Sequence, residues 1–166
     1  MIIRLTDAQA EPHDSDAFRD HGRAKALGWM RTGYMPRGGE DERLELRIAA
    51  YRAEAAFAIH RGVQFDRDPN GFHAPDVDGF SVRYGARPSY GLVTHRGDPD
   101  APYVLLVPVD DRRSSGLVFR IAGYCAFEDA VAMRDAGIGR ALPGTTDPWL
   151  ISQRLLQPVL AVRVAS

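Results

Sequence analysis

The residues best suited to chemistry are a group of carboxylates upstream of a basic residue. Asp76 and Asp78 lie shortly before Arg83, and Glu54 lies further upstream. Mg²⁺ prefers hard oxygen ligands and usually binds one or two protein carboxylates, while water and substrate phosphate complete its shell. A metal held in this way stabilises the charge that develops when a phosphodiester is cleaved. The group therefore predicts a metal-dependent site with Asp76, Glu54 and Asp78 as ligands of Mg²⁺ or Mn²⁺.

A short alternating segment is expected to position these groups. Residues 80–84 alternate apolar and polar side chains, which predicts a strand with Ser81 and Arg83 on one face. The Asp-Gly pair directly before it favours a hairpin turn, because both residues tolerate positive φ. Ser81 and Arg83 could then share a site with Asp76 on the neighbouring strand. The alternative is a hairpin whose ordinary polar residues face solvent.

Glu54 falls within the most regular helical pattern, which covers residues 41–61. Apolar residues recur there at the helical period and predict one buried face, made of Leu44, Ile48, Tyr51, Ala55 and Ile59. Glu54 lies at the rim of this face, where an acid flanked by alanines can lean into a cleft. The alternative is a solvated surface glutamate.

The remaining patterns place strands in the middle of the chain and helices towards both ends. We expect an edge strand at 2–6, a helix at 14–27, an exposed loop at 31–40, strands at 90–95, 103–109 and 117–124, a polar turn at 110–115, a helix at 127–136, a short helix or irregular segment at 149–156 and a last strand at 159–164. This order predicts an α/β fold with a mixed central β-sheet flanked by helices. The length predicts a single domain, with an N-terminal helix and loop at 1–40 and the core at 41–166.

Composition restricts the functional classes. The net charge is −1, so no global basic field attracts nucleic acid, and any binding of DNA needs a local patch or a metal. The single cysteine, Cys125, excludes an intramolecular disulfide and is expected to be a small core residue. The sequence shows neither a signal peptide nor a run long enough to span a membrane, which predicts a cytoplasmic protein without a membrane partner.

Other catalytic arrangements find little support. The five histidines lack the spacing of metal ligands, and no serine occurs in the strand-to-helix turn that a hydrolase nucleophile needs. Lys25 is the only lysine, and this excess of arginine indicates a GC-rich genome. An arginine at a position that chemistry assigns to lysine can therefore reflect composition.

Several segments together resemble a group of phage-encoded proteins related to the PD-(D/E)XK nucleases. The resemblance runs from about Ala49 to Pro158 and is carried by AEAAFAIHRGVQF, PDVDGFSVR, YGLVTHRGD, YVLLVPV and FRIAGY. It implies a restriction-endonuclease-like fold, with Glu54 as the helix carboxylate and Asp76 as the metal-binding aspartate. Arg83 resembles the basic member of the final motif. Asp98 falls where the group tends to have an acidic strand end, for which the resemblance implies no role.

The chain departs from this pattern at Ser81, where the group has a glutamate that completes the metal shell. Arg83 also stays protonated, so it can position phosphate but is a poor proton acceptor. Two functions remain open. In an active nuclease, Asp76 and Glu54 hold the metal, Ser81 orients water or phosphate, and Arg83 stabilises the phosphate. In a catalytically degenerate phage or prophage module, the same region binds nucleic acid or a phage or host protein in the bacterial cytoplasm.

Overall fold

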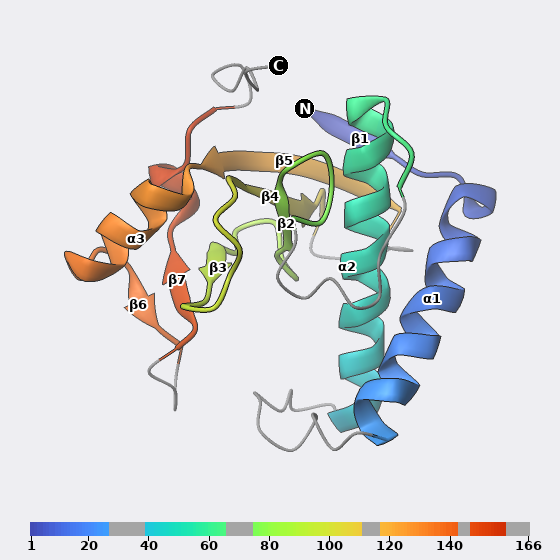
Figure 1. Ribbon diagram of the computed structural model, residues 1–166. Coiled ribbons are helices and arrows are strands. Elements are labelled where there is room, and N and C mark those ends of the chain that lie inside the picture. The colour runs from blue at the N-terminus through green and yellow to red at the C-terminus, as the bar shows by residue number, and fades with distance from the viewer. Residues whose placement is uncertain (27–38, 66–74, 111–116, 143–146, 159–166) are drawn as a thin grey trace.

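The computed structural model describes residues 1–26, 39–65, 75–110, 117–142 and 147–158 (Figure 1). Their elements along the chain are β1 (Ile2–Arg4), α1 (Asp7–Ala26), α2 (Gly39–Arg61), β2 (Ser81–Tyr84), β3 (Leu92–Thr94), β4 (Tyr103–Pro108), β5 (Val118–Cys125), α3 (Phe127–Asp135), β6 (Arg140–Ala141), β7 (Trp149–Ile151) and the 3₁₀-helix η2 (Gln153–Leu155). The loop predicted at 31–40, the polar turn at 110–115 and the last strand at 159–164 lie largely or wholly outside the described residues.

A mixed four-stranded sheet carries the fold, in the order β1-β5-β4-β2. β2 runs parallel to β4, whereas β4 with β5 and β5 with β1 are antiparallel. Parallel neighbours need a long connection, and here the chain between β2 and β4 passes through β3. The predicted mixed α/β architecture is therefore confirmed, and the strands expected at 2–6, 103–109 and 117–124 are all in this sheet.

A second sheet, in the order β3-β7-β6, was not anticipated. The strand expected at 90–95 is confirmed as β3, but it pairs with β7 and not with the central sheet. The prediction of a short helix or irregular segment at 149–156 is wrong for its first part, which forms β7. β7 is only three residues long and obtains its hydrogen bonds from a strand far upstream, so no local periodicity indicates it.

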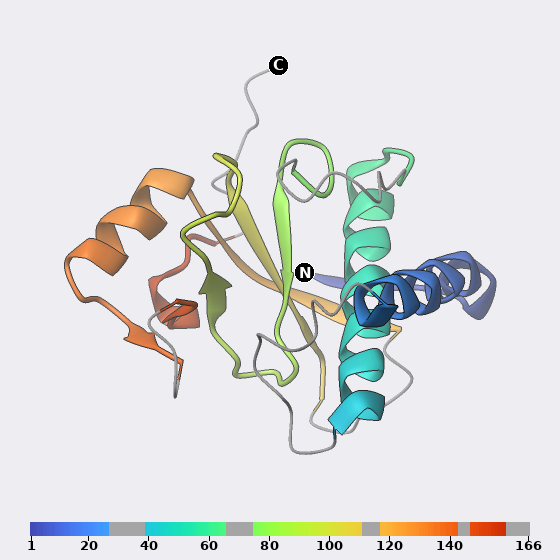
Figure 2. The ribbon, with the colours of Figure 1, turned by 60° about the horizontal axis from the view of Figure 1, so that its bottom comes forward.

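The two long helices lie together on one side of the central sheet (Figures 1 and 2). α1 begins at Asp7, earlier than the predicted start at residue 14. Thr6 and Gln9 form a capping box: the Gln9 N–H donates to Thr6 Oγ1, and the Thr6 N–H donates to Gln9 Oε1. These bonds satisfy backbone donors at the N-terminus of α1 and explain the earlier start.

α2 confirms the helix predicted at 41–61, but its buried face is rotated. Tyr51 and Ala55 are buried as expected, whereas Ile59 is 45% exposed. The core between α2 and the central sheet instead contains Ala53, Ala56, Phe57 and Ala58. Small side chains let a helix approach a sheet closely, and the run of alanines here makes several faces of α2 suitable for packing.

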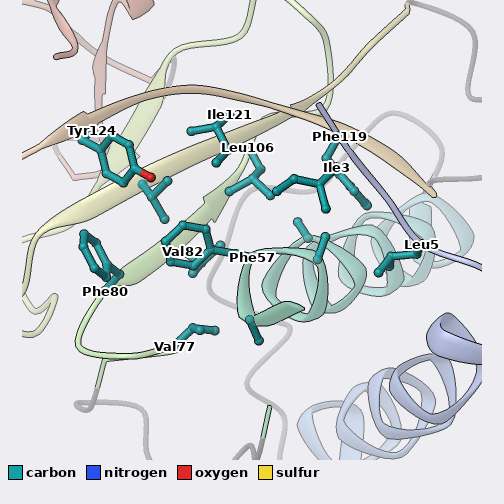
Figure 3. Packing of buried hydrophobic residues seen from close by; sticks show 14 of the residues in the cluster. Ile3, Leu5, Phe57, Val77, Phe80, Val82, Leu106, Phe119, Ile121 and Tyr124 are labelled. Carbon is teal, nitrogen blue, oxygen red and sulfur yellow. The ribbon is translucent and has the colours of Figure 1, made fainter. Parts of the chain in front are cut away.

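The central sheet separates two hydrophobic cores. The first core lies between the sheet and α2, where Phe57, Phe80 and Tyr124 pack with ring centroids 5.4–6.5 Å apart (Figure 3). The second core joins the other face of the sheet to β3, β7 and α3, and includes Leu105 and Cys125. Cys125 is thus a buried core residue, as predicted. Among the described residues, no helix combines the length and apolarity needed to cross a membrane.

Candidate functional site

The predicted Asp-Gly turn forms immediately before β2. Asp78 and Gly79 have φ of 47° and 78°, and Val77 bridges to Phe80 across the turn. Among the described residues, the antiparallel pairing across the turn consists of this isolated bridge. The hydrogen-bonded neighbour of β2 is the parallel strand β4. The expected hairpin is therefore reduced to a tight turn that brings Asp76 back beside β2.

Asp76 binds the strand that it precedes. Its Oδ2 accepts a hydrogen bond from the Val82 N–H at 2.8 Å and lies 3.4 Å from Nη1 of Arg83. β2 is an edge strand of the central sheet, and edge strands carry backbone groups that no neighbouring strand satisfies. Asp76 therefore has a structural role at this edge.

Arg83 links two carboxylates. Its Nη2 lies 2.8 Å from Oδ1 of Asp98, while Nη1 contacts Asp76. The guanidinium carbon also lies 5.6 Å from the centroid of the Tyr103 ring, in cation–π geometry. Because the Arg83 side chain is 23% exposed, the ion pairs are only partly accessible to water.

Asp98 accepts hydrogen bonds in addition to its ion pair with Arg83. Its Oδ2 accepts hydrogen bonds from the His95 N–H at 2.8 Å and from the Tyr103 hydroxyl at 3.0 Å. Burial raises the pKa of Asp98, but the hydrogen bonds from His95 and the positive charge of Arg83 lower it by more. The pKa of Asp98 therefore lies below its ordinary value, and the group is a carboxylate at neutral pH.

Tyr103 shows the complementary shift. Burial, together with the negative charge and hydrogen bond of Asp98, raises the pKa of its phenol. The tyrosine thus remains a neutral hydrogen-bond donor to Asp98. We name the contacting side chains Asp76, Arg83, Asp98 and Tyr103 the Arg83 cluster.

Ser81 is fully buried, and within the described part of the chain its Oγ has no hydrogen-bond partner. Ser81 and Arg83 lie on one face of β2, as expected. Their partners in β4, Tyr103 and Leu105, both belong to the second core. The alternative that the polar residues of this strand face solvent is wrong for Ser81.

Glu54 and Asp78 have different surroundings from the Arg83 cluster. Glu54 is 6% exposed, so its interpretation as a solvated surface glutamate is wrong. It lies on α2, which packs on one face of the central sheet (Figure 2), whereas the β4 partners of Ser81 and Arg83 belong to the core on the other face. Asp78 Oδ2 pairs with Arg61 of α2, whose Nη2 lies 2.7 Å away. The structure thus joins Asp76 to Arg83 but pairs Asp78 with another arginine.

The observed contacts do not fit the expected Mg²⁺ or Mn²⁺ shell. A divalent cation that binds Asp76 Oδ2 or Asp78 Oδ2 has to compete with Arg83 or Arg61 for that oxygen. Within the part of the chain that is described, no three side chains of His, Cys, Asp or Glu form a group that could hold a metal ion. Arg83 instead supplies a permanent positive charge between Asp76 and Asp98.

Sequence reasoning assigned no role to Asp98 and treated Tyr103 only as the start of a strand. Asp98 lies three residues after His95, in a turn that its own side chain closes. This turn was a local signal, but the contacts of Asp98 with Arg83 and Tyr103 depend on the tertiary fold.

Comparisons with protein-family models, curated proteins and solved structures find no match. The candidate site therefore rests on its own geometry.

Proposed function

We propose that this chain is a nuclease-like module of restriction-endonuclease-like architecture that binds a partner without cleaving phosphodiesters. The architecture is supported by the mixed sheet, by α2 on one of its faces and by the sequence motifs that end in β2, β4 and β5. The loss of cleavage is supported by a single observation, the position of Arg83 between Asp76 and Asp98.

Charge explains why this position matters. A guanidinium does not lose its proton at physiological pH, and its covalent attachment keeps a positive charge close to the two carboxylates. A divalent ion must compete with this tethered cation and must also lose hydration water. Ser81 offers a hydroxyl in place of a carboxylate and is fully buried, so it gives the metal little help.

The partner that we propose is a protein of the phage or its host. Binding to nucleic acid depends mainly on Lys and Arg groups that neutralise phosphates. The two arginines at the candidate site, Arg61 and Arg83, already pair with Asp78, Asp76 and Asp98, and the whole chain has a net charge of −1. These charges favour a protein surface over DNA or RNA.

A metal-dependent nuclease is the second candidate, and the contact between Asp76 and Arg83, the two residues that the sequence motif supplies, favours it. In this alternative, Arg83 leaves Asp76 when substrate phosphate arrives, and Asp76 and Glu54 then hold Mg²⁺ or Mn²⁺. The two candidates differ in whether wild type responds to metal.

The test measures the melting temperature and the cleavage of labelled DNA with and without Mn²⁺. We expect wild type to show neither a specific rise nor cleavage, because Arg83 occupies the cation position. Arg83→Met should gain a Mn²⁺-dependent rise, and a further Asp76→Asn change should remove it. Arg61→Met is the matched control and should gain nothing. Cleavage by wild type that disappears in Asp76→Asn would establish the nuclease instead.

A further inference from the structure

Among the residues that the structure describes, three buried polar atoms on one side of the central sheet have no hydrogen-bond partner in the protein. They are Ser81 Oγ, Arg83 Nε and Thr94 Oγ1. Ser81 is fully buried and Thr94 is 2% exposed. Nearly all buried polar atoms in native proteins have a hydrogen-bond partner, either in the protein or in ordered water. Three such atoms in one region call for a common explanation.

The fold brings these atoms to the same interface. Ser81 and Arg83 project from β2 towards the second core, as the location of their β4 partners shows. Thr94 is buried on the same face of β3 as Leu92, which belongs to that core, and β3 contacts β2. Asp98 connects the two strands further, because it binds both Arg83 and the N–H of His95, the residue after Thr94.

Electrostatics determine what can bind there. Asp76 and Asp98 together outweigh the single charge of Arg83, which disfavours an anion. A cation would face the guanidinium and its inward N–H, which disfavours it as well. The two hydroxyls both donate and accept, whereas Arg83 Nε only donates. The ligand must therefore be neutral, small, and able to donate and accept hydrogen bonds.

We propose that a buried water molecule binds between β2 and β3 and bridges Ser81 Oγ, Thr94 Oγ1 and Arg83 Nε. Buried waters typically make about three hydrogen bonds to groups that the protein leaves unsatisfied. The water accepts a hydrogen bond from Arg83 Nε and exchanges hydrogen bonds with the two hydroxyls. It thus extends the Arg83 cluster and attaches the second sheet to the edge of the central sheet, independently of the function proposed above.

A double-mutant cycle tests whether the two hydroxyls share one ligand. Ser81→Ala and Thr94→Val each remove one bond to the water, and each should lower the melting temperature. The double variant should lower it by less than the sum, because the first change already weakens the water site. Ser152→Ala, at an exposed serine, is the control and should leave the melting temperature unchanged. Additive effects, or a rise in either single variant, would overturn the proposal.

A measurement on wild type covers the case in which a variant fails to fold. Nuclear magnetic resonance detects a long-lived bound water through its cross-relaxation with nearby amide protons. We expect such a signal at the amides of Val82 or His95, which flank the hydroxyls in the chain. Its absence in the folded protein would also overturn the proposal.

Discussion

The two faces of the central sheet are stabilised in different ways. The face towards α2 is apolar and aromatic, with Phe57, Phe80 and Tyr124 in mutual contact (Figure 3). The other face combines aliphatic residues with the charged Arg83 cluster, and two of its buried polar atoms, Ser81 Oγ and Arg83 Nε, have no hydrogen-bond partner among the described residues. Apolar packing tolerates many arrangements, whereas buried charges require particular partners. Any specialised role of this chain is therefore best sought on the second face.

The largest expected effect compares adjacent residues of β4 that point to opposite faces. Leu106 is buried in the first core and Leu105 in the second. Each change to alanine should lower the free energy of unfolding by about 2–5 kcal/mol, because it removes a buried side chain and leaves a cavity. Urea unfolding measures both, with Val109→Ala as an exposed control on the same segment. A cost for Leu105→Ala close to that of the control would show that the second core is peripheral.

The next effect concerns the centre of the Arg83 cluster. Asp98→Ala should cost about 2–3 kcal/mol, because it leaves Arg83 and the Tyr103 hydroxyl without their shared acceptor. The exposed Asp100 provides the matched control, and Asp100→Ala should change stability by about 0.5 kcal/mol or less. Equal costs in urea unfolding would contradict the assignment of Asp98 as the central acceptor.

The same carboxylate makes the second face sensitive to acid. The pKa of Asp98 is lower in the folded protein than its ordinary value, since hydrogen bonds from His95 and the charge of Arg83 outweigh burial. Its stabilisation is therefore complete above about pH 4, the ordinary pKa, and is lost as the pH falls through the lower folded value. The stability difference between wild type and Asp98→Asn should shrink below about pH 4. A difference that stays constant between pH 7 and pH 3 would refute the assigned role of the charge.

Sequence patterns predicted the strands of the central sheet better than the rotation of the helix that covers it. The alternation over 80–84 and the apolar run over 103–109 identified β2 and β4 because burial imposes a local period on strands. The exposed Ile59 shows the limit of the same reasoning for α2, where the alanine-rich run at 53–58 is compatible with several rotations. Phe57 is the one large apolar side chain in this run, so the run itself does not fix the rotation.

The contacts of the candidate site were also predicted only in part. The relation of Asp76 to Arg83 followed from a local turn and from strand periodicity, and the structure brings them into contact. The roles of Asp98 and Tyr103 were not predicted, because their contacts with Arg83 form only when β4 and the turn after β3 fold around β2. The pairing of Asp78 with Arg61 of α2 was likewise not predicted, so this acid seemed available for a metal.

A smaller effect distinguishes these two acids. Asp76→Ala should cost about 1–2 kcal/mol, because it removes the acceptor of the Val82 N–H and weakens the Arg83 cluster. Asp78→Ala should cost about 0–1 kcal/mol, since its pair with Arg61 is more exposed. Thermal and urea unfolding measure both. A larger cost for Asp78→Ala would place the structural carboxylate at the turn and not at the edge of β2.

The smallest effect is a change in labelling rate that reports whether the second face opens on its own. Cys125 is buried in the second core, and burial, helped by the charge of Asp129, raises the pKa of its thiol to about 11. Only the thiolate reacts with a disulfide reagent, so at pH 8 labelling should require opening of this core. If the face opens locally, Leu105→Ala should accelerate labelling more than Leu106→Ala does, even where both variants lose similar global stability. Equal acceleration by the two variants would mean that Cys125 is exposed only by global unfolding, and that the two faces of the sheet form one cooperative unit.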